Sequence, residues 1–178
     1  QLEVTDRLVS LASEGFDLAI RHCRREALPE THVAWPLCST ATLIVASAEY
    51  IRRFGRPDSP EMLRHHQCLT YPRGAQSPQW TFESSEQPAE RVSVKVHGPF
   101  ATNNSESLRD AVLAGLGIAL LPDFSAREAI GRGLVQELLP GWRPVEVFAP
   151  QLYVIRPYAP RVSRAVETFS HYLKHTFS

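Results

Sequence analysis

The chain of 178 residues lacks an excess of charge of either sign, because 19 lysines and arginines balance 19 aspartates and glutamates. Non-specific binding to nucleic acid needs a strong positive field, so this chain by itself is not expected to bind DNA. The sequence also lacks an apolar run of about 18 residues and a basic segment leading into an apolar one. We therefore expect neither a membrane span nor a signal peptide.

Cysteine is scarce as well. Cys23, Cys38 and Cys68 are odd in number and scattered, which argues against a disulfide framework and favours a reduced, cytoplasmic setting. Residues 65–68, HHQC, bring histidine and cysteine together without the paired spacing of a zinc motif. A buried Cys68 that packs as a small hydrophobe is favoured over a metal ligand, and no metal or cofactor is expected.

Motifs of catalysis are missing too. The sequence contains no G-x-S-x-G elbow, no G-x-G-x-x-G phosphate loop and no Walker lysine motif. The glycines of residues 114–120, AGLGIAL, follow a predicted helix instead of opening one. We therefore do not expect an enzyme.

What is present is a globular composition, with 43% apolar and 21% charged residues. Strand and helix patterns alternate, which predicts an α/β fold with largely parallel sheets covered by helices. Residues 140–151 are a candidate connection between lobes. The predicted strands lie around residues 2–4 and at 16–21, 41–47, 68–71, 79–83, 91–98, 118–122, 134–140 and 151–157.

The predicted helices are marked by capping residues. A short helix begins at Thr5 or Asp6, carries Leu8, Val9 and Leu11, and ends at Gly15. The other predicted helices are 48–54, capped by Ser47, 58–66, capped by Ser59, 123–131, and a last helix from about residue 162. The last has one apolar stripe, formed by Val162, Ala165, Val166, Phe169, Tyr172 and Leu173.

Residues 99–123 read as a βαβ unit. Asn103 and Glu106 have the spacing of a capping box, and Leu108, Ala111 and Val112 supply a buried stripe. Gly115 and Gly117 then let the chain turn into residues 118–122, IALLP, whose unbroken apolar run suits a strand buried on both faces.

The beginning of that helix is the first candidate binding site. Thr102, Asn103, Asn104 and Ser105 would surround free backbone N–H groups at the positive end of a helix dipole, which suits a small carboxylate. Ordinary capping remains the alternative, although it needs one such residue and not four. Arg21, at the carboxyl end of a predicted strand, could meet a carboxylate in the same way or could pair with Glu30.

Several of these segments together resemble the effector-binding domain of LysR-type transcriptional regulators. The resemblance rests on EGFDLAIR (residues 14–21), LIVASAEYIRRFGRPDSPEMLRHHQCL (43–69), QWTFE (79–83) and NNSESLRDAVLAGLGIALLPDF (103–124). Their order and spacing are more specific than any single match.

The resemblance implies a two-lobed fold like that of type 2 periplasmic binding proteins, with two mixed sheets flanked by helices and joined by two crossover strands, 42–47 and about 149–155. Lobe I would comprise residues 1–45 and 153–178, and lobe II residues 46–152. In the family, a winged helix-turn-helix domain, a linker helix and the first strand and helix of lobe I come before the position of residue 1.

The resemblance also implies the function and the site. The family binds a small effector in the cleft between the lobes and controls transcription allosterically through the winged helix-turn-helix domain, which alone contacts DNA. A homodimer or larger homo-oligomer and an anionic, carboxylate-bearing effector are expected. A solute-binding protein of the same fold and an enzyme of the same architecture, such as a dehydratase, are the alternatives. The effector-contacting residues would be Arg21, His22, Ser47, Phe100, Ala101, Thr102, Asn103, Asn104 and Ser105.

Overall fold

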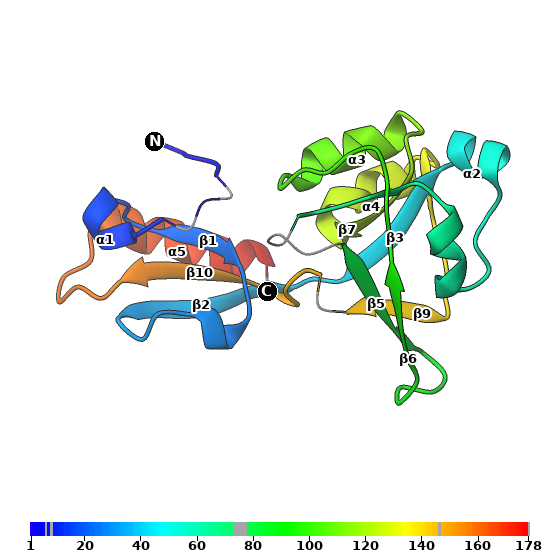
Figure 1. Ribbon diagram of the computed structural model, residues 1–178. Helices are drawn as coiled ribbons and strands as arrows, with labels where there is room; N and C mark the ends of the chain where they lie inside the picture. The colour runs from blue at the N-terminus through cyan, green and yellow to red at the C-terminus, as the bar shows by residue number, and fades with distance from the viewer. Residues whose placement is uncertain (6, 8, 73–77, 146, 178) are drawn as a thin grey trace. The chain divides into compact units, whose positions relative to one another are not determined.

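The computed structural model describes residues 1–5, 7, 9–72, 78–145 and 147–177. The chain divides into two compact units (Figure 1). Unit 1 consists of residues 1–40 and 149–178, and unit 2 of residues 41–148, so the chain passes from one unit to the other twice.

Unit 1 is built on a three-stranded antiparallel sheet. Its strand order is β1-β10-β2, with strands β1 (Ala19–His22), β2 (His32–Ser39) and β10 (Gln151–Pro157). Helix α5 (Arg164–Phe177) lies along this sheet (Figure 1). Its Leu173 packs with Leu37 and Val154 in a small core. Helix α1 (Leu11–Glu14) ends at Gly15, which has the left-handed φ of 76° predicted for it, and a 3-10 turn η1 (Arg25–Ala27) follows β1.

Unit 2 contains two sheets. The first has the order β4-β7-β3-β8 and the second the order β6-β5-β9. The strands are β3 (Thr42–Ser47), β4 (Cys68–Leu69), β5 (Gln79–Ser84), β6 (Arg91–Lys95), β7 (Ile118–Pro122), β8 (Val135–Glu137) and β9 (Trp142–Val145). The helical segments are α2 (Ala48–Phe54), the 3-10 helix η2 (Pro60–His65), α3 (Ser105–Leu113) and α4 (Asp123–Gly131).

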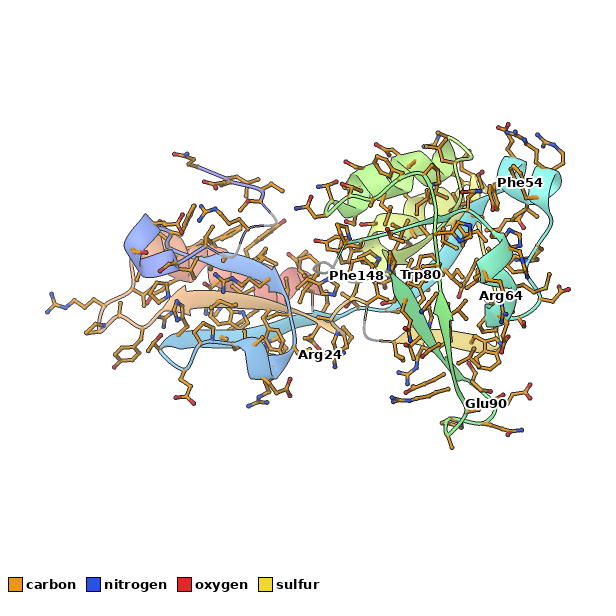
Figure 2. All side chains as sticks on the ribbon, viewed as in Figure 1. Arg24, Phe54, Arg64, Trp80, Glu90 and Phe148 are labelled. Carbon is orange, nitrogen blue, oxygen red and sulfur yellow. The ribbon has the colours of Figure 1, made fainter. Side chains whose placement is uncertain are left out.

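The four-stranded sheet is buried on both faces, which explains the unbroken apolar run of β7. Because side chains alternate along a strand, Ile118 and Leu120 join one core, and Ala119 and Leu121 join another. The first core includes Trp80 of the second sheet, which lies in the interior of unit 2 (Figure 2). The second core is closed by apolar side chains of α3 and α4, namely Leu108, Ala111, Val112, Ala126 and Ala129.

The α/β fold class with mixed sheets is confirmed, but the sheets are less parallel than expected. Among the described strands, β4 and β7 form the one parallel pair, and the other pairs are antiparallel. The alternation of helix and strand patterns says how elements follow one another along the chain. It does not determine the direction of strands that pair across long separations, such as β1 with β10.

Several local expectations were wrong. Residues 1–5 form no strand, and the side chains of Leu2 and Val4 are exposed, because none of the described residues pairs with this segment. Helix α1 begins after Ser10, later than expected; the predicted starting residue Asp6 and the apolar residue Leu8 lie outside the described residues. Ser59 precedes a 3-10 helix, and its hydroxyl donates to Glu61 instead of capping.

Two strands were missed in the sequence. Strand β2 contains Pro36, which a central strand would not tolerate, but among the described strands β2 pairs with β10 alone, and the proline is exposed at this edge. Strand β9 lies within the predicted connection 140–151 and pairs with β5, so most of that segment belongs to unit 2. The predicted stripe of α5 is only partly buried, since Phe169 and Tyr172 are exposed and stack on each other.

Candidate functional site

The segment that leads into α3 is held in place by the chain around β4. The N–H of Thr70 donates to the carbonyl of Phe100 at 3.1 Å, and the N–H of Thr102 donates to the carbonyl of Thr70 at 3.1 Å. Ala101 thereby forms a parallel bridge with Thr70. Gly98 allows this close approach, because a Cβ at its position would lie 2.2 Å from the carbonyl oxygen of Cys68. Residues 100–102 are therefore held by backbone hydrogen bonds to the residue that follows β4.

Asn104 caps α3, whereas the sequence pattern placed this role on Asn103. The Oδ1 atom of Asn104 accepts a hydrogen bond from the N–H of Ser107 at 2.8 Å, and Asn104 has extended backbone angles. Thr102 Oγ1 accepts from the N–H of Asn104 at 3.2 Å. The predicted capping box was wrong by one residue, because two adjacent asparagines give the same local pattern and only the backbone decides which one ends the extended segment.

Asn103 is left exposed by this arrangement. Within the described ranges, no protein group lies at hydrogen-bonding distance from its side chain. The backbone N–H groups of Ser105 and Glu106 likewise find no acceptor among the described residues, since the first intrahelical bond runs from the N–H of Leu108 to the carbonyl of Asn104. These donors and the helix dipole together offer a site for a small anion.

The first turn of α3 also carries a carboxylate, whose charge is compensated. Glu106 forms an ion pair with Arg109, and its Oε1 accepts from the hydroxyl of the buried Ser125 at 3.0 Å. Hydrogen bonding to Asp110 and the nearby charge of Glu106 raise the pKa of Arg109 above its ordinary value, so this guanidinium stays charged. The carboxylate is thus directed toward Arg109 and Ser125, which weakens its repulsion of an anion at the helix end.

Ser125 was missed in the sequence analysis. Its Oγ lies 3.0 Å from Oγ of Ser105, so the first turn of α4 supports the first turn of α3. The two serines are separated by 20 residues, and no local pattern connects them. The only indication in the sequence was that a serine interrupts the apolar face of the helix at 123–131.

The structure places Ser47 away from this helix end. Ser47 is buried at the end of β3, and its Oγ caps α2 by accepting from the N–H of Tyr50 at 3.2 Å. A Cβ at Gly115, just beyond the carboxyl end of α3, would lie 3.7 Å from that oxygen. Since nine helical residues span about 13 Å, Ser47 belongs to the opposite end of α3.

The start of β3 lies nearer the candidate site than its end. Thr42 pairs with Pro122, the residue before α4, because β3 and β7 are antiparallel. The N–H of Asp123 donates to the carbonyl of Ala41 at 2.8 Å. The remaining expected residue of unit 2, Phe100, is half-buried and packs against the core beneath α3.

Arg21 and His22 belong to unit 1, at the end of β1. The guanidinium of Arg21 donates to the carbonyl of Val9, and the ion pairs of the described residues include none between Arg21 and Glu30. His22 Nε2 lies 2.8 Å from Thr40 Oγ1. Both side chains are half-buried and are held by partners within their own unit.

Neither a metal centre nor a membrane segment is found in the part of the chain that the structure describes. No cluster of three or more histidine, cysteine, aspartate or glutamate side chains is arranged there to hold a metal ion. Among the same residues, no helix combines the length and the apolar character needed to span a bilayer.

Comparison with known proteins points to one family. The family model described as the LysR substrate binding domain matches residues 1–178. The HTH-type transcriptional regulator YhjC of Escherichia coli is 34% identical over 174 residues, covering 97% of this chain and 56% of the relative. The probable HTH-type regulator LtrA of Klebsiella pneumoniae is 30% identical over 154 residues, covering 86% and 48%.

Solved structures agree with this assignment. Full-length AphB of Vibrio cholerae superposes with a TM-score of 0.80 at 23% identity and covers 100% of this chain and 58% of its own. The regulatory domain of AphB from Vibrio vulnificus gives a TM-score of 0.72 at 25% identity, with coverage of 97% and 80%. The chain spans about half the length of the curated relatives that it matches.

Proposed function

The chain belongs to the LysR substrate-binding domain family, and on this premise we propose that it senses a small anionic effector for a longer, DNA-binding transcriptional regulator. The single observation that carries the regulatory role is the match of the family model along all 178 residues. The matched relatives are described as HTH-type transcriptional regulators, which supports regulation over solute transport or catalysis.

In the proposed mechanism the effector carboxylate occupies the N-terminal end of α3. The N–H groups of Ser105 and Glu106 have no acceptor within the described residues, and the amide of Asn103 is exposed beside them. The hydroxyl hydrogen of Thr102 is available to donate, because among the described residues its oxygen has one partner, the N–H of Asn104, from which it accepts. Charge-assisted hydrogen bonds from these groups would supply the affinity.

Regulation would follow from differential affinity. An effector that contacts this end of α3 and also the residues of unit 1 expected at the site, Arg21 and His22, stabilises the conformation in which both sets of donors reach it. That change would be passed to a winged helix-turn-helix domain in the longer protein, within a homodimer or larger homo-oligomer. DNA binding belongs to that domain, in keeping with the balanced charge of this chain.

We propose further that the longer protein completes unit 1 with a strand and a helix. The chain covers 80% of the solved regulatory domain of AphB from Vibrio vulnificus, which leaves room for such elements. No described residue pairs with the outer edge of β1, and the aromatic rings of Phe169 and Tyr172 on α5 are exposed. A strand and a helix at these two places would satisfy the free backbone groups of β1 and bury the rings.

The test is a calorimetric titration of the full-length regulator with a panel of aliphatic and aromatic carboxylates. For the acid that binds, Asn103→Ala and Thr102→Val are each expected to weaken affinity about 10-fold or more, because a hydrogen bond to a charged group contributes about 1.5–3 kcal/mol. Ser107→Ala, an exposed serine of the same helix turn, is the matched control and should leave affinity unchanged. Unaltered binding in both site variants would refute the placement of the carboxylate.

A further inference from the structure

The two places where the chain passes between the units are tied together inside unit 1. Thr40 is the last residue of unit 1 before the first passage, and Ala149 is the first residue after the second. The hydroxyl of Thr40 donates to the carbonyl of Ala149 at 2.9 Å, and the N–H of Thr40 donates to the carbonyl of Pro150 at 2.9 Å. One residue therefore joins both passages through its side chain and its backbone.

His22, the last residue of β1, contacts Thr40 at the same point. Its Nε2 lies 2.8 Å from Thr40 Oγ1, and the N–H of the following residue, Cys23, donates to the carbonyl of Gln151 at 3.2 Å. The end of β1 is thus connected to the end of β2 and the start of β10 at the same point. We refer to His22, Thr40 and Ala149 as the clasp.

The number of hydrogens on each group determines which atoms donate and which accept in the clasp. The carbonyl of Ala149 has no hydrogen, so the single hydroxyl hydrogen of Thr40 is used toward it. The oxygen of Thr40 must then accept from His22, which requires a hydrogen on Nε2. Both the neutral tautomer that carries this hydrogen and the imidazolium can donate it.

We propose that the clasp makes the two passages move as one hinge, and that His22 is a positioning residue of this hinge. Any change in the orientation of the units must rotate backbone bonds near residues 40–41 and 148–149. The hydrogen bonds of the clasp join Thr40 to Ala149 and Pro150 on the unit 1 side of both passages, so the two passages leave unit 1 from positions that are fixed relative to each other. This coupling of the two passages requires no effector. Only the further step, that the coupling affects how the regulator responds to an effector, rests on the proposed function.

The structure also contains a matched control. Thr31 Oγ1 lies 3.1 Å from Nδ1 of His32, a threonine–histidine hydrogen bond in the same unit. Neither residue adjoins a passage between the units. Thr31→Val therefore removes the same type of contact as Thr40→Val without touching the hinge, and Thr40→Ser keeps the hydroxyl of the clasp.

The experiment measures the distance between one label on each unit by pulsed electron spin resonance. Phe54 of unit 2 and Tyr158 of unit 1 are exposed and aromatic, so p-acetylphenylalanine can replace both and carry nitroxides without use of the native cysteines (Figure 2 shows Phe54). Thr40→Val is expected to widen the distance distribution about twofold. His22→Phe, which removes one clasp bond, should give an intermediate width.

The controls decide between a hinge and a purely structural contact. Thr31→Val and Thr40→Ser are expected to retain the width of the unsubstituted protein, and amide exchange at β1 and β10 checks that unit 1 remains folded in each variant. A Thr40→Val protein with less stable unit 1 but an unchanged distribution would overturn the proposal. So would an unsubstituted protein whose distribution is already as wide as that of Thr40→Val. Failure of the carboxylate titration leaves these outcomes unaffected, so the two proposals can fail separately.

Discussion

The two adjacent asparagines before α3 provide a sharp test of the structure. The structure gives the capping role to Asn104, whose Oδ1 is 2.8 Å from the N–H of Ser107, and leaves the side chain of Asn103 exposed. Replacement of an N-cap residue by alanine costs about 1 kcal/mol, within a range of roughly 0.5–2 kcal/mol. Exposed substitutions elsewhere usually change stability by less than about 0.5 kcal/mol. We therefore expect Asn104→Ala, and not Asn103→Ala, to destabilise unit 2.

The expected difference is large enough to measure. For a unit of this size, 1 kcal/mol corresponds to a shift of roughly 4–8 °C in the unfolding midpoint. Urea unfolding followed by far-ultraviolet circular dichroism, together with thermal scans, gives both quantities. Asn104→Asp is the matched control: it keeps the capping oxygen and adds a negative charge at the positive helix end, so its stability should equal or exceed that of the parent.

Two results would refute the reasoning. If Asn103→Ala lowers the midpoint as much as Asn104→Ala, then the sequence-based capping box describes the helix better than the structure does. If Asn104→Asp is as unstable as Asn104→Ala, the capping hydrogen bond does not contribute the stability assigned to it. Because Asn103 is also the proposed effector contact, a stable Asn103→Ala protein is needed to interpret the titration.

Three further predictions concern unit 2. Gly98→Ala should destabilise the protein by more than about 2 kcal/mol in urea unfolding, because its Cβ would lie 2.2 Å from a backbone oxygen, whereas Gly131→Ala, with open space at the Cβ, should be neutral or slightly stabilising. Burial lowers the pKa of His66, whose Nδ1 lies 3.1 Å from the hydroxyl of Tyr50. The contribution of His66 to the free energy of unfolding is therefore fully present above the ordinary pKa of about 6.5 and declines as the pH falls below it. A His66→Gln protein should show a flatter dependence of the urea midpoint between pH 7.5 and 5.5. Burial raises the pKa of Cys68 to about 12, so iodoacetamide at pH 8 should alkylate it only after unfolding; mass spectrometry that finds Cys68 modified in the folded protein would contradict its burial.

Local patterns predicted most of the elements of unit 2 and their ends. Ser47 caps α2 and Gly55 closes it as expected, and residues 118–122 form a strand buried on both faces. The two ends of α2 depend on neighbouring residues alone, since a cap needs an oxygen three residues before an N–H and the positive φ at Gly55 favours glycine. The quoted motifs, in their order, also predicted the family and the fold class correctly.

Other features depended on contacts between distant parts of the chain. Strand β2 is formed despite Pro36 because the proline lies at an edge, and residues 2–4 remain outside any strand because no described segment pairs with them. Which asparagine caps α3 was decided by where the chain leaves its hydrogen bonds to Thr70. The contact between Ser105 and Ser125 was decided by the packing of α4 on α3. The effector contacts and the cytoplasmic setting stay predictions.

The sequence by itself thus determined the identity of the helix that offers backbone donors, since the polar residues before it and the glycines after it are local properties. Only the tertiary structure decided which groups remain available at its end, because hydrogen bonds to Thr70, Ser107 and Ser125 use some donors and acceptors and leave others without a partner among the described residues. It also decided the surroundings of Ser47 and His22, whose hydrogen-bond partners, Tyr50 and Thr40, come close only after strands run past one another.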